Sequence, residues 1–292
     1  MLNSWTKVPA LWFGPEERAT AIGGVTLSAL VGTALGMVLT PMLVETLPIP
    51  TVGLIYGAIA AFSAVLFLIF AREKPATPPC EAGDEVRSLM LDGLKHALSI
   101  KNFWFYLAIM FIGLGIFNGV TTWVETIIRP RGFSATDAGI LGALMLAGGV
   151  LGAIIIAPLS DKLHKRQAFL LLGFIMAIPC VLGLAFARHA FSLFTFSFAL
   201  GFFLVSVNPV GMQYATEITQ PTPEGTSNGL VQMAGQLSVV FVYIMDALKT
   251  PDGSYTPALL LTTGLLVIGV FLVLQMKDPQ PVMAEAIERQ PS

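Results

Sequence analysis

Apolar runs of about twenty residues recur eight times along this 292-residue chain, and they constrain its fold more than any other feature. A helix needs about 20 such residues to cross the hydrocarbon core of a bilayer, and backbone polar groups inside lipid must be satisfied within the segment. The runs cover about 21–44, 52–70, 103–128, 138–159, 167–187, 190–216, 227–248 and 257–275. The sequence therefore predicts an all-α polytopic membrane protein with about eight transmembrane helices.

The overall composition excludes several other classes of protein. Hydrophobic residues make up 55% of the chain and charged residues only 12%, whereas an ordinary soluble domain carries roughly 25% charged residues. A net charge of −2 gives no basic surplus that would attract nucleic acid. We therefore expect the lipid bilayer, and not nucleic acid, to be a partner of this chain.

The distribution of basic residues predicts the orientation in the membrane. Of the sixteen Lys and Arg, twelve fall on the side of the predicted spans that also holds both termini. The other side holds the remaining four, which are Arg129, Arg131, Arg188 and Lys249. Loops rich in Lys and Arg stay in the cytoplasm. We expect a protein of the plasma (inner) membrane with both termini cytoplasmic.

One long polar segment, 71–102, separates two spans from the following six. It opens with several prolines and continues with apolar residues at helical spacing, namely Val86, Leu89, Met90, Leu94 and Leu98. This pattern predicts a linker followed by a short amphipathic helix on the inner membrane face, although a solvated loop also fits it. The predicted units are 1–70, the linker, a six-helix bundle at 103–276 and a cytoplasmic tail at 277–292.

Polar residues inside the spans are the first candidates for function, because burying them in lipid is costly. Asn118, Thr121, Thr122 and Glu125 follow one another at intervals that place them along one side of a helix, and Gln232 and Gln236 are four residues apart. Such groups either line a hydrated cavity or hydrogen-bond neighbouring helices. The predicted substrate-cavity residues are Asn118, Thr122, Asn208, Gln232 and Gln236.

Three carboxylates lie near predicted span ends and could couple transport to protons. They are Glu125, Glu217 and Asp246. In a proton-coupled protein one of them would have to titrate during the cycle. Solvation at the interface explains Glu125 equally well, and a helix cap or a charge pair explains Glu217.

The sequence lacks the motifs of metalloproteases and of phosphate-binding enzymes. It contains no HExxH or GxxxxGK[ST] pattern, and its three histidines, at 96, 164 and 189, are too scattered to bind one ion. We therefore predict no catalytic residue, no metal site and no cofactor, and we expect a protein that is not an enzyme.

The loop after the fourth span carries the first resemblance to a known family. It reads PLSDKLHKR from Pro158 to Arg166 and is similar to the loop signature of the major facilitator superfamily, found at a cytoplasmic turn between the second and third helices of a six-helix half. The resemblance implies a charge latch, in which a carboxylate faces the N-terminus of an adjacent helix and breaks away when two halves rock. The implied gating residues are Asp161, Lys162, Lys165 and Arg166.

A longer stretch, from Gly201 to Gln236, resembles one particular branch of this superfamily. Its sequence GFFLVSVNPVGMQYATEITQPTPEGTSNGLVQMAGQ resembles the feline leukaemia virus subgroup C receptor-related branch of the superfamily. In that fold the six spans after the linker look like helices seven to twelve and the two before it like helices five and six, with Val8 to Thr20 similar to the end of helix four. The resemblance implies a partial major facilitator fold of 2 + 6 helices that lacks the first helices.

The same resemblance carries expectations about substrate. Animal members of the branch are associated with choline, ethanolamine or haem movement, and the family places a helix-eleven glutamine, matched by Gln236, in the central cavity. The family's helix-seven aromatic cage residue falls at Asn118. An aromatic face holds a quaternary ammonium by cation–π attraction, which asparagine cannot provide, and this argues against a choline-like substrate.

These features together predict a function in membrane transport. We expect a secondary transporter that moves a small organic solute by alternating access, as a uniporter or coupled to protons. The single complete bundle implies that this chain is incomplete by itself and needs a complementary N-terminal helical fragment. A non-transporting membrane scaffold or receptor is the alternative.

Overall fold

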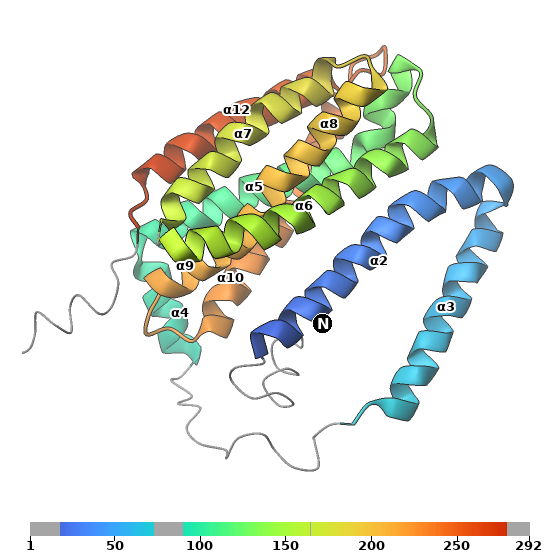
Figure 1. Cartoon of the computed structure of the whole chain (residues 1–292). Helices are drawn as coiled ribbons and strands as arrows, with labels where there is room; N and C mark the ends of the chain where they lie inside the picture. The colour runs from blue at the N-terminus through green and yellow to red at the C-terminus, as the bar shows by residue number, and fades with distance from the viewer. Residues whose placement is uncertain (1–17, 73–89, 164, 279–292) are drawn as a thin grey trace, which may run out of the picture.

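The computed structural model describes residues 18–72, 90–163 and 165–278, and within these ranges all regular secondary structure is helical (Figure 1). The all-α prediction is therefore confirmed. Several predicted features lie outside the described residues, namely the resemblance to helix four before Arg18, the proline-rich part of the linker, Val86, Leu89, His164 and the tail beyond 278.

Every predicted span coincides with a helix or with two consecutive helices. The continuous helices are α2 (Arg18–Thr46), α3 (Ile49–Phe70), α4 (Met90–Ser99), α5 (Lys101–Ile128), α6 (Ala135–Leu163), α7 (Arg166–Phe186) and α12 (Thr256–Gln275), and a short 3₁₀ turn, η1 (Arg129–Arg131), follows α5. Among the described residues seven segments are long and apolar enough to cross a membrane, and α2 adds a shorter apolar stretch at 31–46.

Two of the spans are interrupted, which the sequence pattern did not predict. The sixth span consists of α8 (Ala190–Leu200), a π-helical turn η2 (Gly201–Val205) and α9 (Val207–Ile218). The seventh consists of α10 (Glu224–Leu237) and α11 (Val240–Ala247), with the break directly after Gln236 and Leu237. Interruptions of this kind free backbone groups inside a span and often mark functional positions.

Glycines bring α6 into backbone contact with the interrupted sixth span. A Cβ atom on Gly148 would collide with the carbonyl oxygen of Phe198, and one on Gly152 with that of Phe202. Small residues permit this approach, which stabilises helix association where lipid removes the hydrophobic incentive. The buried Ser197 hydroxyl adds a 2.6 Å hydrogen bond to the Leu141 carbonyl on α6.

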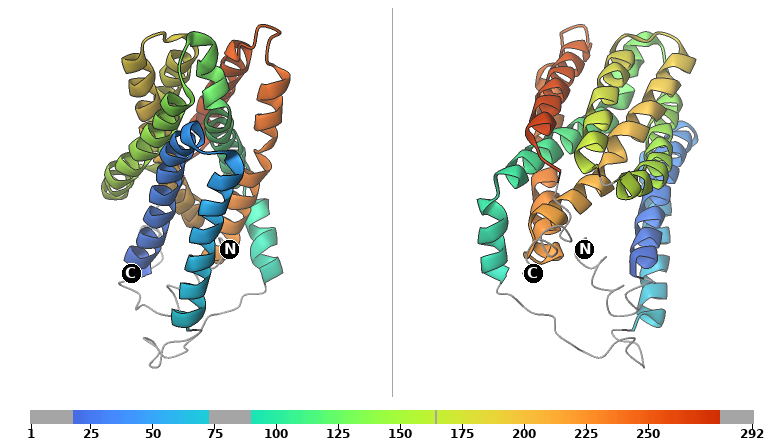
Figure 2. Two further views of the ribbon diagram at one scale, coloured as in Figure 1. Left: turned by 90° about the vertical axis from the view of Figure 1, so that its right-hand side faces the viewer. Right: turned by 60° about the vertical axis from the view of Figure 1, so that its left-hand side comes forward.

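The α2–α3 pair runs beside the six-span bundle on the α6 side (Figures 1 and 2). Met37 of α2 packs where Gly139 and Gly142 of α6 leave room. The glycines at 32 and 36, which also have small-residue spacing, have open space around them among the described residues. At the α2–α6 contact it is therefore the α6 glycines, and not Gly32 or Gly36, that permit the close approach. Helix α3 is exposed along most of its length.

The short helix α4 lies in the second half of the linker segment, where the sequence predicts an amphipathic helix. Its buried residues Gly93 and Ala97 face the α9–α10 loop and α10. The Thr222 hydroxyl donates to the Gly93 carbonyl at 3.1 Å, and His96 Nε2 lies 3.1 Å from the Gln220 carbonyl oxygen. The buried side of α4 is thus occupied by protein, and its location at the inner membrane face stays a prediction.

The four basic residues predicted for one side of the membrane do lie at one end of the fold. The α5–α6, α7–α8 and α11–α12 turns that carry them share that end, and the α6–α7 corner lies at the opposite end together with the ends of α3 and α12 (Figure 1). Which end faces the cytoplasm stays a prediction.

Candidate functional site

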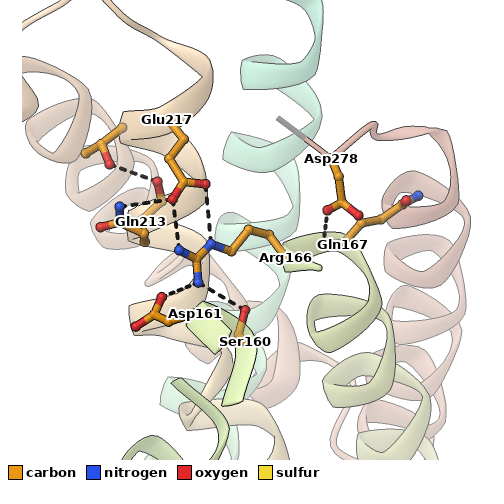
Figure 3. A network of polar contacts seen from close by, with 8 residues as sticks. Ser160, Asp161, Arg166, Gln167, Gln213, Glu217 and Asp278 are labelled. Atoms are coloured by element: carbon orange, nitrogen blue, oxygen red, sulfur yellow. Dashed lines mark hydrogen bonds and ion pairs between the residues drawn. The ribbon is translucent and has the colours of Figure 1, made fainter. Parts of the chain in front are cut away.

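A network of charged groups at the α6–α7 corner centres on Arg166 (Figure 3). This residue begins α7 and is only 7% exposed. Its guanidinium donates to Glu217 through two nitrogens, with Nη2 2.8 Å from Oε1 and Nε 3.3 Å from Oε2, and it also pairs with Asp161. Arg166 Nη1 lies 3.2 Å from the Ser160 hydroxyl. The arginine therefore joins the ends of α6, α7 and α9.

The helix dipoles explain why these charges need each other. A cation at the N-terminus of α7 and an anion in the last turn of α9 are each in the unfavourable position of their own helix. Pairing Arg166 with Glu217 offsets both, and the Gln213 side-chain amide donates a further 3.0 Å hydrogen bond to Glu217 Oε1. Two parallel N–H···O bonds between an arginine and a carboxylate are also among the strongest hydrogen bonds in proteins.

A second contact extends the network to the end of α12. The Asp278 carboxylate accepts a 2.7 Å hydrogen bond from the Gln167 backbone N–H, which is one of the donors left open at the start of α7. The Gln167 side chain donates back to the Val273 carbonyl at 2.9 Å. Sequence analysis missed Asp278, since its only signal is an acidic residue shortly after an apolar run.

The predicted gating loop is brought together only in part. Asp161 and Arg166 are in contact, but Lys162 and Lys165 are exposed and form no ion pair with the described residues. The resemblance implied that the loop carboxylate would face the N-terminus of the adjacent helix. In the structure Asp161 binds the side chain of Arg166, the first residue of α7, while Asp278 accepts from the α7 backbone. The role of this loop as a latch stays a prediction.

The five predicted cavity residues lie on three helices, α5, α9 and α10, that pack against one another. The α5–α10 contact is close, since a Cβ on Gly235 would meet the Leu114 side chain. Asn118, Asn208 and Gln232 are half-buried, and Thr122 and Gln236 are exposed. Gln232 and Gln236 occupy the last two turns of α10, next to the break between α10 and α11.

These cavity candidates do not hold the described helices together by hydrogen bonds. The side chains of Asn118, Thr122, Gln232 and Gln236 have no hydrogen-bond partner among the described residues, and the buried Oδ1 of Asn208 has none either. Thr121, from the same polar stripe, donates to its own helix at the Phe117 carbonyl. The role of these candidates in lining a cavity stays a prediction.

The three predicted coupling carboxylates are far from forming one cluster. Glu125 lies 3.7 Å from Arg129 at the end of α5, and Asp246 accepts a 3.1 Å hydrogen bond from the Tyr255 hydroxyl. Burial and the Asp246 carboxylate raise the pKa of Tyr255 to about 12. Glu217 lies at the opposite end of the bundle, in the Arg166 network. Within the described ranges no group of acidic, His or Cys side chains could hold a metal ion.

Comparison with known proteins relates this architecture to transporters. A protein from Archaeoglobus fulgidus with no assigned function is 31% identical over 77% of this chain and 99% of its own length. Zebrafish solute carrier family 49 member A3 is 30% identical, and the human choline/ethanolamine transporter FLVCR2 is 27% identical. The alignments cover 89% and 90% of this chain but 56% and 55% of those two proteins, so the chain spans about half their length.

Similarity in structure supports the same fold. A bacterial homologue of the human lysosomal transporter Spinster, solved in an inward-facing and unoccupied conformation, superposes with a TM-score of 0.72 at 15% identity, over 92% of this chain and 72% of that protein. A sequence model of the Major Facilitator Superfamily matches residues 1–243 and 127–291. This family, the solute carrier and the choline/ethanolamine transporter are transporters and not enzymes. The chain is therefore an integral membrane protein that belongs to the Major Facilitator Superfamily.

Proposed function

We propose that the chain is the substrate-binding part of a secondary transporter that moves a small organic solute by alternating access. The observation that carries this proposal is the pairing of interrupted spans with unpaired amides. The π-helical turn η2 precedes Asn208 in the chain, and the α10–α11 break follows Gln236. Transporters of several folds place substrate near the membrane midplane at such discontinuous helices.

The proposed solute is one that amide groups can recognise. Amides offer both donors and acceptors, and Asn118, Gln232 and Gln236 have none of theirs engaged by the described residues. Relatives include proteins named choline/ethanolamine transporters. The ammonium group of ethanolamine can donate N–H bonds to the amide oxygens, whereas the quaternary ammonium of choline has no N–H to donate, so ethanolamine is the better first probe.

Alternating access needs two helical bundles around one site. The described residues supply α5 to α12 as one bundle and α2 with α3 beside it. We propose that a complementary N-terminal helical fragment completes the second bundle, and that the chain alone transports poorly or not at all.

The test is uptake of radiolabelled ethanolamine and choline into proteoliposomes. The chain would be reconstituted alone and together with the first four helices of a full-length relative. We expect uptake only from the pair, and a loss of at least tenfold in Gln236→Ala but not in Gln275→Ala, an exposed glutamine at the end of α12 and outside the predicted cavity. Uptake that is equal in both variants would contradict the cavity assignment.

Transport by this chain is either uniport or coupled to protons, and the two differ in their response to a proton gradient. Uniport predicts uptake that does not depend on an imposed proton gradient. Proton coupling predicts uptake that follows the gradient and is lost in Glu125→Gln, Glu217→Gln or Asp246→Asn.

Both termini are proposed to be cytoplasmic, in the plasma (inner) membrane. In a background without Cys80 and Cys180, a membrane-impermeant thiol reagent added outside cells should label Lys249→Cys but not Lys162→Cys, and the reverse result would invert the topology.

A further inference from the structure

A polar pocket lies at the end of the bundle opposite Arg166, separate from the cavity residues discussed above. Its walls come from the end of α5 with η1, from the α7–α8 turn, and from the start of α12 with the residues before it. The cavity volume is about 220 Å³. The two charged side chains that line it are both arginines, Arg131 and Arg188, and its lining residues include no carboxylate.

The two guanidinium groups have unused hydrogen-bonding capacity. Arg131 is half-buried and is held in place by two backbone carbonyls, with Nη1 2.8 Å from the Ala187 oxygen and Nη2 3.2 Å from the Ile127 oxygen. A guanidinium has five N–H donors, so three remain. Arg188 is exposed and has no ion-pair or hydrogen-bond partner among the described residues. The pocket therefore has a fixed cation and a free one.

The start of α12 adds further features that favour an anion. Ser254 and Thr256 line the pocket, and their hydroxyls are 2.9 Å apart. Thr256 is the first residue of α12, where the helix dipole is positive. The carboxylates on the adjoining segments lie outside the lining: Asp246 accepts from the Tyr255 hydroxyl, and Asp252 is exposed in the α11–α12 loop.

We propose that this pocket binds a phosphate ester. Paired guanidinium groups suit phosphate because its several oxygens can accept their planar N–H forks. The volume leaves room beside the phosphate for an attached organic group, and the apolar lining residues Ile127, Phe186 and Leu259 give that group a surface to contact. The source is either the head group of an acidic phospholipid or a water-soluble phosphate ester.

The experiment uses the full chain purified in a neutral detergent. Native mass spectrometry would compare the number of bound phosphatidylglycerol molecules with the number of bound phosphatidylcholine molecules. Isothermal titration calorimetry would measure the affinity of the chain for glycerol 3-phosphate. The test variant is Arg188→Gln, since the described residues make no bond to this side chain that folding could require. The matched control is Arg129→Gln, because Arg129 is at the same end, has a side chain that is 75% exposed, and does not line the pocket.

We expect at least one probe to bind and Arg188→Gln to weaken it by about tenfold, as the loss of charge-assisted hydrogen bonds predicts, while Arg129→Gln binds like the parent chain. The probe that binds identifies the source. Absence of binding by both probes, equal binding in Arg188→Gln and the parent, or an equal loss in both variants would overturn the proposal. Circular dichroism and size-exclusion chromatography of each variant would confirm that it is folded.

Discussion

Arg166 and Glu217 are 51 positions apart in the sequence, yet the guanidinium Nη2 lies 2.8 Å from the carboxylate Oε1 and joins the first residue of α7 to the last turn of α9. The arginine side chain is 8% exposed and the glutamate side chain 25%. Breaking an ion pair that is this shielded from solvent leaves an uncompensated charge and therefore costs more than breaking a surface pair. The corner is thus a point at which helix ends are held by charge.

Removing the arginine should destabilise the bundle. Arg166→Ala leaves Glu217 without its cation, and we expect it to lower the free energy of unfolding by about 2 kcal/mol. The measurement is unfolding by dodecyl sulfate in mixed micelles, followed by circular dichroism. Lys162→Ala removes an exposed cation from the same loop and should cost almost nothing. Equal losses in the two variants would show that the pairing has no special role.

The contact between Asp278 and Gln167 behaves like a helix cap supplied by the segment that follows α12. Asp278→Ala leaves the Gln167 N–H unpaired and should cost about 1 kcal/mol, as the loss of other N-caps does. Asp278→Asn keeps an acceptor oxygen and should retain most of that stability. The same unfolding assay distinguishes them, and a loss from asparagine as large as that from alanine would argue that charge, not hydrogen bonding, is what matters there.

The Ser197 hydroxyl should contribute to the α6–α8 contact. Ser197→Ala removes a buried interhelical hydrogen bond to Leu141, and comparable bonds in membrane proteins are worth about 0.6 kcal/mol on average. Thr195→Ala is the control, since Thr195 is exposed and its hydroxyl bonds only within its own helix, to the Phe191 carbonyl. We expect a small, measurable loss from the first variant alone. Identical unfolding curves for the two would count against this contribution.

Glycines in α6 and α2 should respond in opposite ways to added bulk. A Cβ on Gly152 would collide with the backbone of Phe202, so Gly152→Ala should cost about 1–3 kcal/mol by forcing the helices apart. Gly36 has open space around it, so Gly36→Ala should be neutral or slightly stabilising. Thermal denaturation in detergent compares the two. A tolerant Gly152 would mean that α6 is free to shift.

The helices could be predicted from the sequence because the cause is local. An apolar run near twenty residues has no alternative to helical hydrogen bonding in lipid, and the predicted spans accordingly coincide with helices. The interruptions at Gly201–Val205 and after Leu237 were not predicted, since hydropathy does not distinguish a π-helical turn or a two-residue break from a continuous helix. These breaks depend on how neighbouring helices satisfy the freed backbone groups.

Some residues of the candidate sites could be predicted from the sequence, and others could not. Asn118, Gln232 and Gln236 can be picked out from the sequence alone, because each is a polar residue within an apolar span. That Asp278 caps α7 and that Arg131 and Arg188 share one pocket follows from the folded arrangement of the helices. These groups are 111 positions apart in the first case and come from separate turns in the second. Their proximity depends on helix packing in three dimensions, which no local pattern of residues records.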